Sequence, residues 1–273
     1  MALPRILSIA GSDSGGGAGI QADIKAITLL GGHAMTAVTA LTAQDTTGVH
    51  RVELASPDMV AGQIEACVHD IGVDAVKIGM LGSPEIAAVV ADRLHGIGVP
   101  VVFDPVMVST SGSALADGAT ILAFERLMRL ATLTTPNLPE LAALGGLDAV
   151  APKTGAVLVK GGHGTGDEIE DVLHAGGERF AFYSPRVRTV HTHGTGCTLA
   201  SAIATGLGAG LPLDLAVERG IAFVQAAIAH APGLGRGNGP LGPAQGRVPF
   251  YDALAAMDAR GWRASDYAAK WPG

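Results

Sequence analysis

Short runs of apolar, mostly β-branched residues alternate along this chain with longer amphipathic stretches, and this alternation restricts the fold more than any other feature. The runs end in Gly, Asp or Pro, as strands do where they lead into the loops of a parallel sheet. Strands are predicted at 6–10, 37–41, 75–78, 99–103, 130–133 and 156–159, and helices at 20–30, 58–70, 84–95 and 118–129. The pattern predicts an α/β fold with a mostly parallel central sheet.

Two of these helices begin with the same signal, a serine followed by a proline and an acid. Ser56 and Ser83 stand in the capping position, and the proline after each suits the first helical residue. The acid that follows suits the positive end of the helix dipole. Both helix starts are therefore predicted from the sequence.

The chain is long enough for one large domain of 273 residues. No Pro/Ser-rich linker and no repeat of fixed period divides residues 1–243, so we expect them to form a single domain. Residues 234–249 are rich in Gly and Pro, and residues 244–273 are expected to form a C-terminal tail.

Composition excludes several classes of protein. The 48% hydrophobic residues and only 16% charged residues predict a packed globule rather than a disordered chain. A net charge of −7 argues against a general electrostatic grip on nucleic acid or on an anionic membrane. The longest uncharged stretch, 189–213, is interrupted by histidines, glycines and hydroxyl residues and does not predict a membrane span. Cys67 and Cys197 lie too far apart in sequence for a CxxC motif or a disulfide framework, and a cytoplasmic location is expected.

A glycine-rich loop follows the first predicted strand at 11–19. Such a loop suits an anion or the close approach of a ligand to the backbone. It has no Gly-Lys-Ser/Thr ending for a P-loop, and Ile20 breaks the dinucleotide-binding spacing. A tight turn between strand and helix explains the loop equally well.

A second glycine motif, 191–197, precedes an apolar helical run. The backbone N–H groups of residues 194–197 would point out of a helix start, where they can stabilise a transferring phosphoryl group. Cys197 in this place is a candidate base, although a thiol of ordinary pKa is mostly protonated at neutral pH. The alternative is a buried cysteine at the start of a core helix. A zinc site of His191, His193 and Cys197 lacks the usual ligand spacing.

Polar residues follow several predicted strands, and a parallel sheet would bring them to one edge. Asp104, Asn137 and Glu140 lie just beyond two of these strands, and Lys160 follows a third before Gly161-Gly162. Carboxylates suit Mg²⁺ and its waters, and a lysine beside glycines suits phosphate. Taken singly, Glu140 is better explained as a first-turn helix acid and Lys160 as a surface cation. Their joint placement favours a phosphoryl-transfer site.

Seven motifs, in order along residues 5–243, carry a resemblance to a known family. They are AGSD at 10–13 with the segment 15–23, TALTAQ at 39–44, KIGML at 77–81, DPVM at 104–107, TPNLPE at 135–140, KGGH at 160–163 and THGTGC at 192–197. Together they resemble the hydroxymethylpyrimidine/phosphomethylpyrimidine kinases of the ribokinase-like superfamily. The resemblance implies a three-layer α/β/α sandwich and ATP-dependent phosphorylation of 4-amino-5-hydroxymethyl-2-methylpyrimidine and then of its monophosphate, for thiamine biosynthesis.

The resemblance also implies a role for each motif residue. Gln44 would hold the aminopyrimidine, whose edge needs one donor and one acceptor. Lys160 would contact the ATP phosphates. The remaining implied sites are Gly11, Asp23 and Met80 for the pyrimidine, Asn137 and Thr195 for the nucleotide, Asp104 and Glu140 for Mg²⁺, and Gly194, Thr195, Gly196 and Cys197 for catalysis.

The residue at position 197 distinguishes the related kinases from one another, because most ribokinase-like sugar kinases and many pyridoxal kinases have aspartate where this chain has Cys197. A cysteine favours the pyrimidine branch, although some pyridoxal kinases also use it. The alternatives are a pyridoxal kinase and a non-catalytic pyrimidine-binding protein. Retention of Lys160, Asp104 and Glu140 favours an enzyme. A sugar kinase is the weakest alternative, and a homodimer is expected by likeness to the family.

The chain departs from the family where a further helix usually precedes the lysine-bearing strand. Only residues 147–155 separate Gly145-Gly146 from that strand, which is too little for a helix and its loops. We therefore expect this helix to be missing and one sheet face to be partly bare. The hypothesis is that the tail segment 250–271 or a partner chain shields that face.

Overall fold

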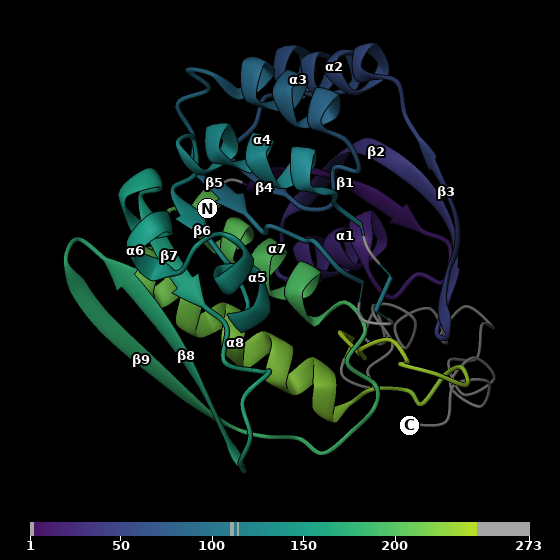
Figure 1. Cartoon of the computed structure of the whole chain (residues 1–273), viewed down its shortest axis with the longest axis vertical. Helices are drawn as coiled ribbons and strands as arrows, with labels where there is room; N and C mark the ends of the chain where they lie inside the picture. The colour runs from purple at the N-terminus through teal and green to yellow at the C-terminus, as the bar shows by residue number, and fades with distance from the viewer. Residues whose placement is uncertain (1–2, 110–111, 114, 245–273) are drawn as a thin grey trace, which may run out of the picture.

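The computed structural model describes residues 3–109, 112–113 and 115–244. These residues form one large sheet with helices packed on both of its faces (Figure 1). The predicted three-layer α/β/α architecture is confirmed. Within the described residues, no helix is both long enough and apolar enough to cross a bilayer.

The sheet comprises β1 (Arg5–Asp13), β2 (His33–Asp45), β3 (Gly48–Leu54), β4 (Ala75–Ile78), β5 (Val101–Phe103), β6 (Leu133–Thr134), β7 (Ala156–Val159), β8 (Glu168–Ala175) and β9 (Glu178–Pro185). Their order is β3-β2-β1-β4-β5-β6-β7-β8-β9. The strands from β2 to β7 pair in parallel, while β3 on one edge and β8 and β9 on the other are antiparallel. The carboxyl ends of six strands thus meet at one edge, as the strand–helix alternation predicts.

One layer of helices consists of α2 (Pro57–Ala66), α3 (Pro84–Leu94) and α4 (Gly118–Met128), with the short α5 (Leu138–Ala143) and α6 (Leu147–Val150) beside them. The other layer consists of α1 (Gly19–Leu29), α7 (Thr195–Gly208) and α8 (Leu213–Ala229). Strand β5 shows why both faces need cover. Val101 and Phe103 belong to the first hydrophobic core, between the sheet and the layer of α2, α3 and α4, where Phe103 contacts Phe124 edge-on with ring centroids 5.2 Å apart. Val102 belongs to the second core, between the sheet and the layer of α1, α7 and α8.

The sequence predicts the parallel strands and their helices well. The six predicted strands correspond to β1, β2, β4, β5, β6 and β7. Ser56 and Ser83 cap α2 and α3 by accepting hydrogen bonds from the N–H groups of Met59 and Ile86. The antiparallel strands β3, β8 and β9 were not predicted, because charged side chains, nearly all of them exposed, interrupt these strands and leave no apolar run.

The prediction that residues 147–155 hold no helix is wrong. The one-turn helix α6 occupies Leu147–Val150, and a 3₁₀ turn continues it over Ala151–Lys153. Gly145 and Gly146 have φ angles of 95° and 87°, so the chain turns from α5 into α6 without a separate loop. Val150 is fully buried in the first core, and the short helix therefore supplies part of the cover expected to be missing.

One face of the β8–β9 hairpin remains open to solvent. In Figure 1 α8 passes behind the hairpin, and no helix of the described chain covers its front. That face carries polar groups: the Glu170 carboxylate pairs with Arg179 at 2.5 Å and accepts the Tyr183 hydroxyl at 3.0 Å. A polar face needs no apolar cover. The segment 250–271, proposed as the shield, lies outside the described residues.

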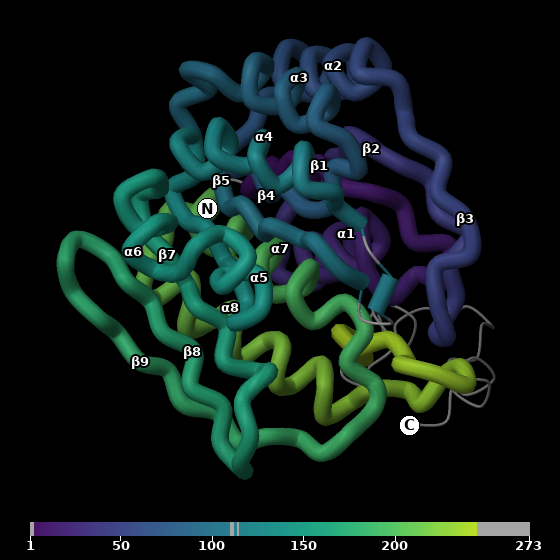
Figure 2. Tube along the Cα trace, viewed as in Figure 1, coloured from purple at the N-terminus to yellow at the C-terminus, as the bar shows by residue number. Residues whose placement is uncertain are grey.

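The end of the described chain returns to the carboxyl edge of the sheet. Figure 2 shows it beside the turn between β2 and β3. There the N–H groups of Arg236 and Gly237 donate to the Thr46 hydroxyl at 3.1 Å, and Gly239 accepts the N–H of His193 at 3.1 Å. The segment therefore fixes both the β2 end and the start of α7.

A fully buried ion pair lies beneath this edge. Lys77 on β4 donates to both carboxylate oxygens of Asp23 on α1, at 3.0 and 2.8 Å. The hydroxyls of Ser8 and Ser201 donate to the same carboxylate at 2.5 and 2.8 Å. Burial opposes the charge of Lys77, but Asp23, Cys197 and Asp104 outweigh it and raise its pKa. The pair joins β1, β4, α1 and α7.

Lys77→Met should lower the free energy of unfolding by about 3–5 kcal/mol, because it leaves the Asp23 carboxylate buried without its counter-ion. Urea unfolding followed by circular dichroism measures the loss. The control is Arg126→Met, which breaks an exposed ion pair with Asp92 and should cost about 1 kcal/mol or less. Equal effects of the two substitutions would contradict a structural role for the buried pair.

Candidate active site

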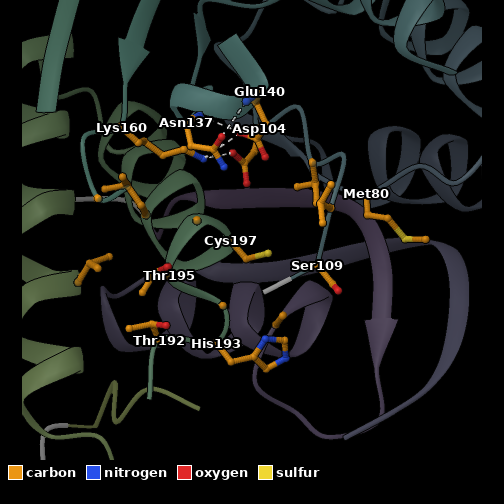
Figure 3. Close-up of a pocket in the computed structure, with 18 of the residues that line it drawn as sticks. Met80, Asp104, Ser109, Asn137, Glu140, Lys160, Thr192, His193, Thr195 and Cys197 are labelled. Atoms are coloured by element: carbon orange, nitrogen blue, oxygen red, sulfur yellow. Dashed lines mark hydrogen bonds and ion pairs between the residues drawn. The ribbon is translucent and has the colours of Figure 1, made fainter. Parts of the chain in front are cut away.

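A cavity of about 660 Å³ opens at the carboxyl edge of the parallel strands. Segments far apart in the sequence line it: the ends of β1, β2, β4, β5 and β7, the start of α5, the start of α7 and part of α8. Figure 3 shows Lys160, Asp104 and Glu140 on one side of it, Cys197 near the middle, and His193 on the other side. The parallel topology produces this convergence.

The first group of site residues is an acid–lysine cluster. The Lys160 ammonium donates to Asp104 Oδ1 at 2.6 Å and lies 3.8 Å from Glu140 Oε2. Asp104 Oδ1 also accepts the Thr135 hydroxyl at 2.9 Å. Asn137 and Glu140 form a capping box at the start of α5, each accepting the other's backbone N–H at 2.8 Å. Glu140 is thus both a helix-capping acid and a member of the site.

Burial and charge act in opposite directions within this cluster. Burial disfavours the ammonium of Lys160, but Asp104 and Glu140 outweigh it and raise its pKa. Burial raises the pKa of Glu140; Lys160 opposes the shift and Asp104 adds to it. The lysine therefore stays charged, and the cluster places one cationic group beside two carboxyl groups.

The start of α7 forms the second group. Gly194 has a φ angle of 84°, and a Cβ there would overlap the carbonyl oxygen of Gly17. The N–H of Thr195 donates to Thr192 and that of Thr198 to Gly194, whereas the N–H groups at 196 and 197 have no acceptor within the described chain. They remain available to an anion at the positive end of a 14-residue helix.

Gly196 connects the two groups. A Cβ on Gly196 would lie 3.3 Å from Asp104 Oδ2 and 3.4 Å from Lys160 Nζ. The helix start and the end of the lysine-bearing strand therefore face the same space, as a phosphoryl-transfer site requires. Only glycine leaves that space open to a ligand.

Cys197 lies in the first turn of α7 and lines the cavity. Burial raises the pKa of its thiol to about 11, although Lys77 beneath it and a hydrogen bond from the Gly19 N–H oppose the shift. The thiol is therefore protonated at neutral pH in the ligand-free protein, even more fully than an ordinary cysteine.

The glycine-rich loop at 11–19 is occupied by its own side chain. The Asp13 carboxylate accepts the N–H groups of Gly15, Gly17 and Ala18 at 2.8–2.9 Å. The loop is therefore a turn closed around an internal anion, and its backbone N–H groups are not free for a ligand phosphate. This favours the turn interpretation over the anion cradle.

The residues assigned to the acceptor pocket are brought together with one exception. Gln44 at the end of β2 lines the cavity with Gly11 and Met80, and a Cβ on Gly11 would lie 2.7 Å from Met80 Sδ. Asp23 does not line the cavity. Its carboxylate is fully buried against Lys77, so it acts below the pocket floor and cannot touch a ligand.

Several pocket residues were given no role from the sequence. Asp13 and His193 stand in recognised motifs, but nothing in those motifs indicates that their side chains meet at 2.9 Å across 180 positions. Asp171 lines the cavity from β8 and Arg186 from the residue just after β9, and neither strand was predicted. Asp171 accepts the Gly161 N–H at 2.8 Å, and Arg186 donates to the Gly162 and Gly166 carbonyls, so both hold the loop after Lys160.

Comparison with known sequences places the chain in a family. The model of the phosphomethylpyrimidine kinase family matches residues 13–242. A hydroxymethylpyrimidine/phosphomethylpyrimidine kinase of Rhizobium meliloti is 46% identical over 252 residues, which cover 86% of this chain and 95% of that protein. The thiamine biosynthesis bifunctional protein ThiED of Geobacter sulfurreducens is 47% identical over 251 residues, and the match covers 86% of this chain and about half, 51%, of that protein.

Solved structures agree on the fold. A phosphomethylpyrimidine kinase from Clostridium difficile is 35% identical with a TM-score of 0.73, over 82% of this chain and 99% of that one. The pyridoxal kinase of Staphylococcus aureus in complex with AMP-PCP and pyridoxal is 32% identical with a TM-score of 0.81, over 90% and 95%. The chain has the ribokinase-like fold and belongs to the phosphomethylpyrimidine kinase family.

Proposed function

We propose that this protein transfers the γ-phosphoryl group of ATP to the hydroxymethyl group of 4-amino-5-hydroxymethyl-2-methylpyrimidine, and then phosphorylates the resulting monophosphate, for thiamine biosynthesis. One observation carries the proposal. A single cavity holds Lys160 and the free N–H groups at the start of α7, and Gln44 lines it beside His193. In Figure 3 Cys197 lies between Lys160 and His193. Family membership supports the same reaction.

The nucleotide end is supplied by charge and by backbone. Lys160 is positioned to contact the phosphates. Asn137 lies beside it in Figure 3, and Thr195 lines the cavity at the start of α7. Arg186, Val187 and Val224 extend the lining beyond the glycine loop at 161–166. The binding of AMP-PCP by the Staphylococcus aureus pyridoxal kinase supports a nucleoside triphosphate at this end.

The carboxylates of Asp104 and Glu140 fit Mg²⁺. Within the described residues no three His, Cys, Asp or Glu side chains gather as a metal cage. Mg²⁺ nevertheless suits this place, since it commonly keeps several waters and takes only one or two carboxylates besides the phosphates. When bound, it would neutralise charge on the phosphates. Asp104 already pairs with Lys160, so Asp104 would hold both cations in place.

The transfer itself needs alignment and charge stabilisation. The acceptor oxygen forms a bond to the γ-phosphorus while the bond from that phosphorus to ADP breaks. The N–H groups of Gly196 and Cys197 point from the helix start toward the moving phosphoryl oxygens. The hydroxyl proton passes to the Cys197 thiolate, so turnover depends on deprotonation of this thiol.

Pyridoxal is the second candidate acceptor, because a pyridoxal kinase shares 32% identity and the whole fold. The Gln44 amide favours the aminopyrimidine, whose edge offers a donor beside an acceptor. The expected homodimer and the cytoplasmic location stay predictions.

A substrate panel tests the function directly. With Mg-ATP, we expect ADP release to be fastest with hydroxymethylpyrimidine, followed by formation of the diphosphate from the monophosphate in the same mixture, detected by mass spectrometry. Faster turnover of pyridoxal would overturn the pyrimidine assignment. Pyrimidine binding without ADP release would identify a non-catalytic binder.

Two substitutions separate the proposed roles of the thiol and the amide. Cys197→Ala should lower kcat at least about 100-fold, because it removes the proton acceptor, with little change in pyrimidine binding. Gln44→Ala should weaken pyrimidine binding about tenfold and leave ATP binding intact. Kinetics with calorimetry of each ligand measure both. Unchanged turnover in Cys197→Ala, or equal loss of both ligands in Gln44→Ala, would contradict these roles.

The raised pKa of Cys197, about 11, predicts a pH dependence. Because the reactive form has lost its proton, reaction speeds up as the pH rises toward the pKa, about tenfold per pH unit. In a Cys67→Ala background, which leaves Cys197 as the one thiol, iodoacetamide labelling of the ligand-free protein should rise from pH 7 to pH 10 without a plateau. A plateau below pH 8 would show an already activated thiolate. Circular dichroism at each pH checks folding.

A further inference from the structure

The His193 side chain contacts Asp13 and Gln44, two residues that lie far from it in the sequence. Its Nε2 atom is 2.9 Å from Asp13 Oδ2 and 3.2 Å from Gln44 Nε2. The residue is only 7% exposed, and its ring packs against Gly17, where a Cβ would overlap it. Its backbone N–H is held by Gly239. The ring therefore has little freedom to swing away from either partner.

The contact with Asp13 determines which ring nitrogen of His193 carries a hydrogen. The Asp13 carboxylate already accepts three backbone N–H groups. Burial alone would raise the pKa of Asp13, but His193 and the N–H groups of Ala18 and Gly15 lower it overall. An ionised carboxylate accepts and cannot donate, so the Nε2 atom of His193 must carry a hydrogen and donate it.

This donor conflicts with an amide nitrogen of Gln44 at the same atom, because two N–H groups would then face each other. The other end of the amide shows the matching conflict. Gln44 Oε1 lies 3.2 Å from the Thr42 hydroxyl oxygen, but that hydroxyl has a single hydrogen, and its shorter contact is with the Ser12 carbonyl at 2.9 Å. Two oxygens without a hydrogen between them would then face each other.

Exchanging the oxygen and nitrogen of the Gln44 amide, by a half turn about its last bond, resolves both conflicts at once. The oxygen then accepts from the Nε2–H of His193, shared with Asp13, and the nitrogen donates to the Thr42 hydroxyl. The Gln44 backbone does not need to move, since Ser14 holds it on both sides, by accepting its N–H at 2.8 Å and donating to its carbonyl at 2.7 Å.

We propose that the Asp13–His193 pair is a positioning device that sets the orientation of the Gln44 amide and thereby the hydrogen-bonding pattern the pocket accepts. The pocket then offers an acceptor on the His193 side and a donor on the Thr42 side. The assignment of the ligand as an aminopyrimidine rests on the proposed function.

This orientation fixes how an aminopyrimidine lies. Its exocyclic amino group donates to the amide oxygen on the His193 side, and its adjacent ring nitrogen accepts from the amide nitrogen on the Thr42 side. On the ring, the hydroxymethyl carbon is the neighbour of the amino carbon and not of that nitrogen. The hydroxyl is therefore directed to the side of His193, where Gly194 is the N-cap of α7 and Cys197 lies in its first turn.

A pair of ligands with opposite patterns tests the device. The second ligand is the 4-oxo analogue, 5-hydroxymethyl-2-methylpyrimidin-4-one, which carries a donor on the ring nitrogen and an acceptor at position 4. The wild-type protein should favour the 4-amino compound by at least about 100-fold in kcat/KM, because both hydrogen bonds mismatch for the 4-oxo compound.

His193→Phe should free the amide to turn and lower this ratio below about tenfold, mainly through KM for the 4-amino compound, with kcat changed less than about threefold. His193→Gln should restore the ratio, because its side-chain amide can donate to Asp13 and to Gln44. His95→Phe, at an exposed histidine after α3, is the matched control. An unchanged ratio in His193→Phe, whatever its absolute rates, would overturn the proposal.

Calorimetric binding of the two ligands keeps this result separate from the proposed reaction. If the wild-type protein binds the 4-amino compound but does not phosphorylate it, the proposed function fails and the ratio of Kd values decides on the Asp13–His193 device. If the wild-type protein binds neither pyrimidine, the Asp13–His193 pair does not select an aminopyrimidine, and both the inference and the proposed function are rejected.

Discussion

The contact between the glycine-rich loop and the start of α7 is the constraint on which the site depends. Gly194 has a positive φ angle and packs against the carbonyl of Gly17 so closely that a side chain would overlap it. This packing brings the free N–H groups of α7 over the end of β5 and β7, where Asp104 and Lys160 lie. The same contact places His193 against Asp13. One backbone approach thus builds both ends of the cavity.

Charge is distributed in two layers below and around this contact. The Lys77–Asp23 pair is fully buried and touches no solvent, while the Lys160–Asp104 pair faces the cavity. A buried charge without its counter-ion is costly, so the Lys77–Asp23 pair holds β1, β4, α1 and α7 in fixed positions relative to one another. The upper layer keeps the Lys160 ammonium and the carboxyl groups of Asp104 and Glu140 side by side, an arrangement that fits the proposed binding of a nucleotide with Mg²⁺. Cys197 lies between the layers, and burial keeps its proton on.

The antiparallel hairpin β8–β9 completes the Lys160 end of the cavity from outside the parallel core. Asp171 and Arg186 hold the loop after Lys160 through its backbone, so the position of the lysine depends on strands that carry no motif of their own. One face of the hairpin is exposed and polar, so the hairpin needs no helix to cover that face.

Much of the architecture was predictable, because parallel strands buried on both faces need apolar runs such as those of β4 and β7, and their helices need caps such as Ser56 and Ser83. Half-exposed strands lack that signal, and β8 and β9 were missed. The one-turn helix α6 was excluded by counting loop residues, since the sequence does not reveal that two glycines at positive φ make a loop unnecessary.

For the site, the sequence by itself determined the chemical groups and their order: a lysine, two carboxylates, a thiol at a helix start and an amide, each just beyond a strand or before a helix. Only the tertiary structure decided which of these groups meet. Asp23 pairs with Lys77 below the pocket, the loop folds around Asp13, and His193 joins Asp13 to Gln44. The reason is physical, since local hydrogen bonding fixes strands and helices, whereas contacts across 180 positions depend on how whole layers pack.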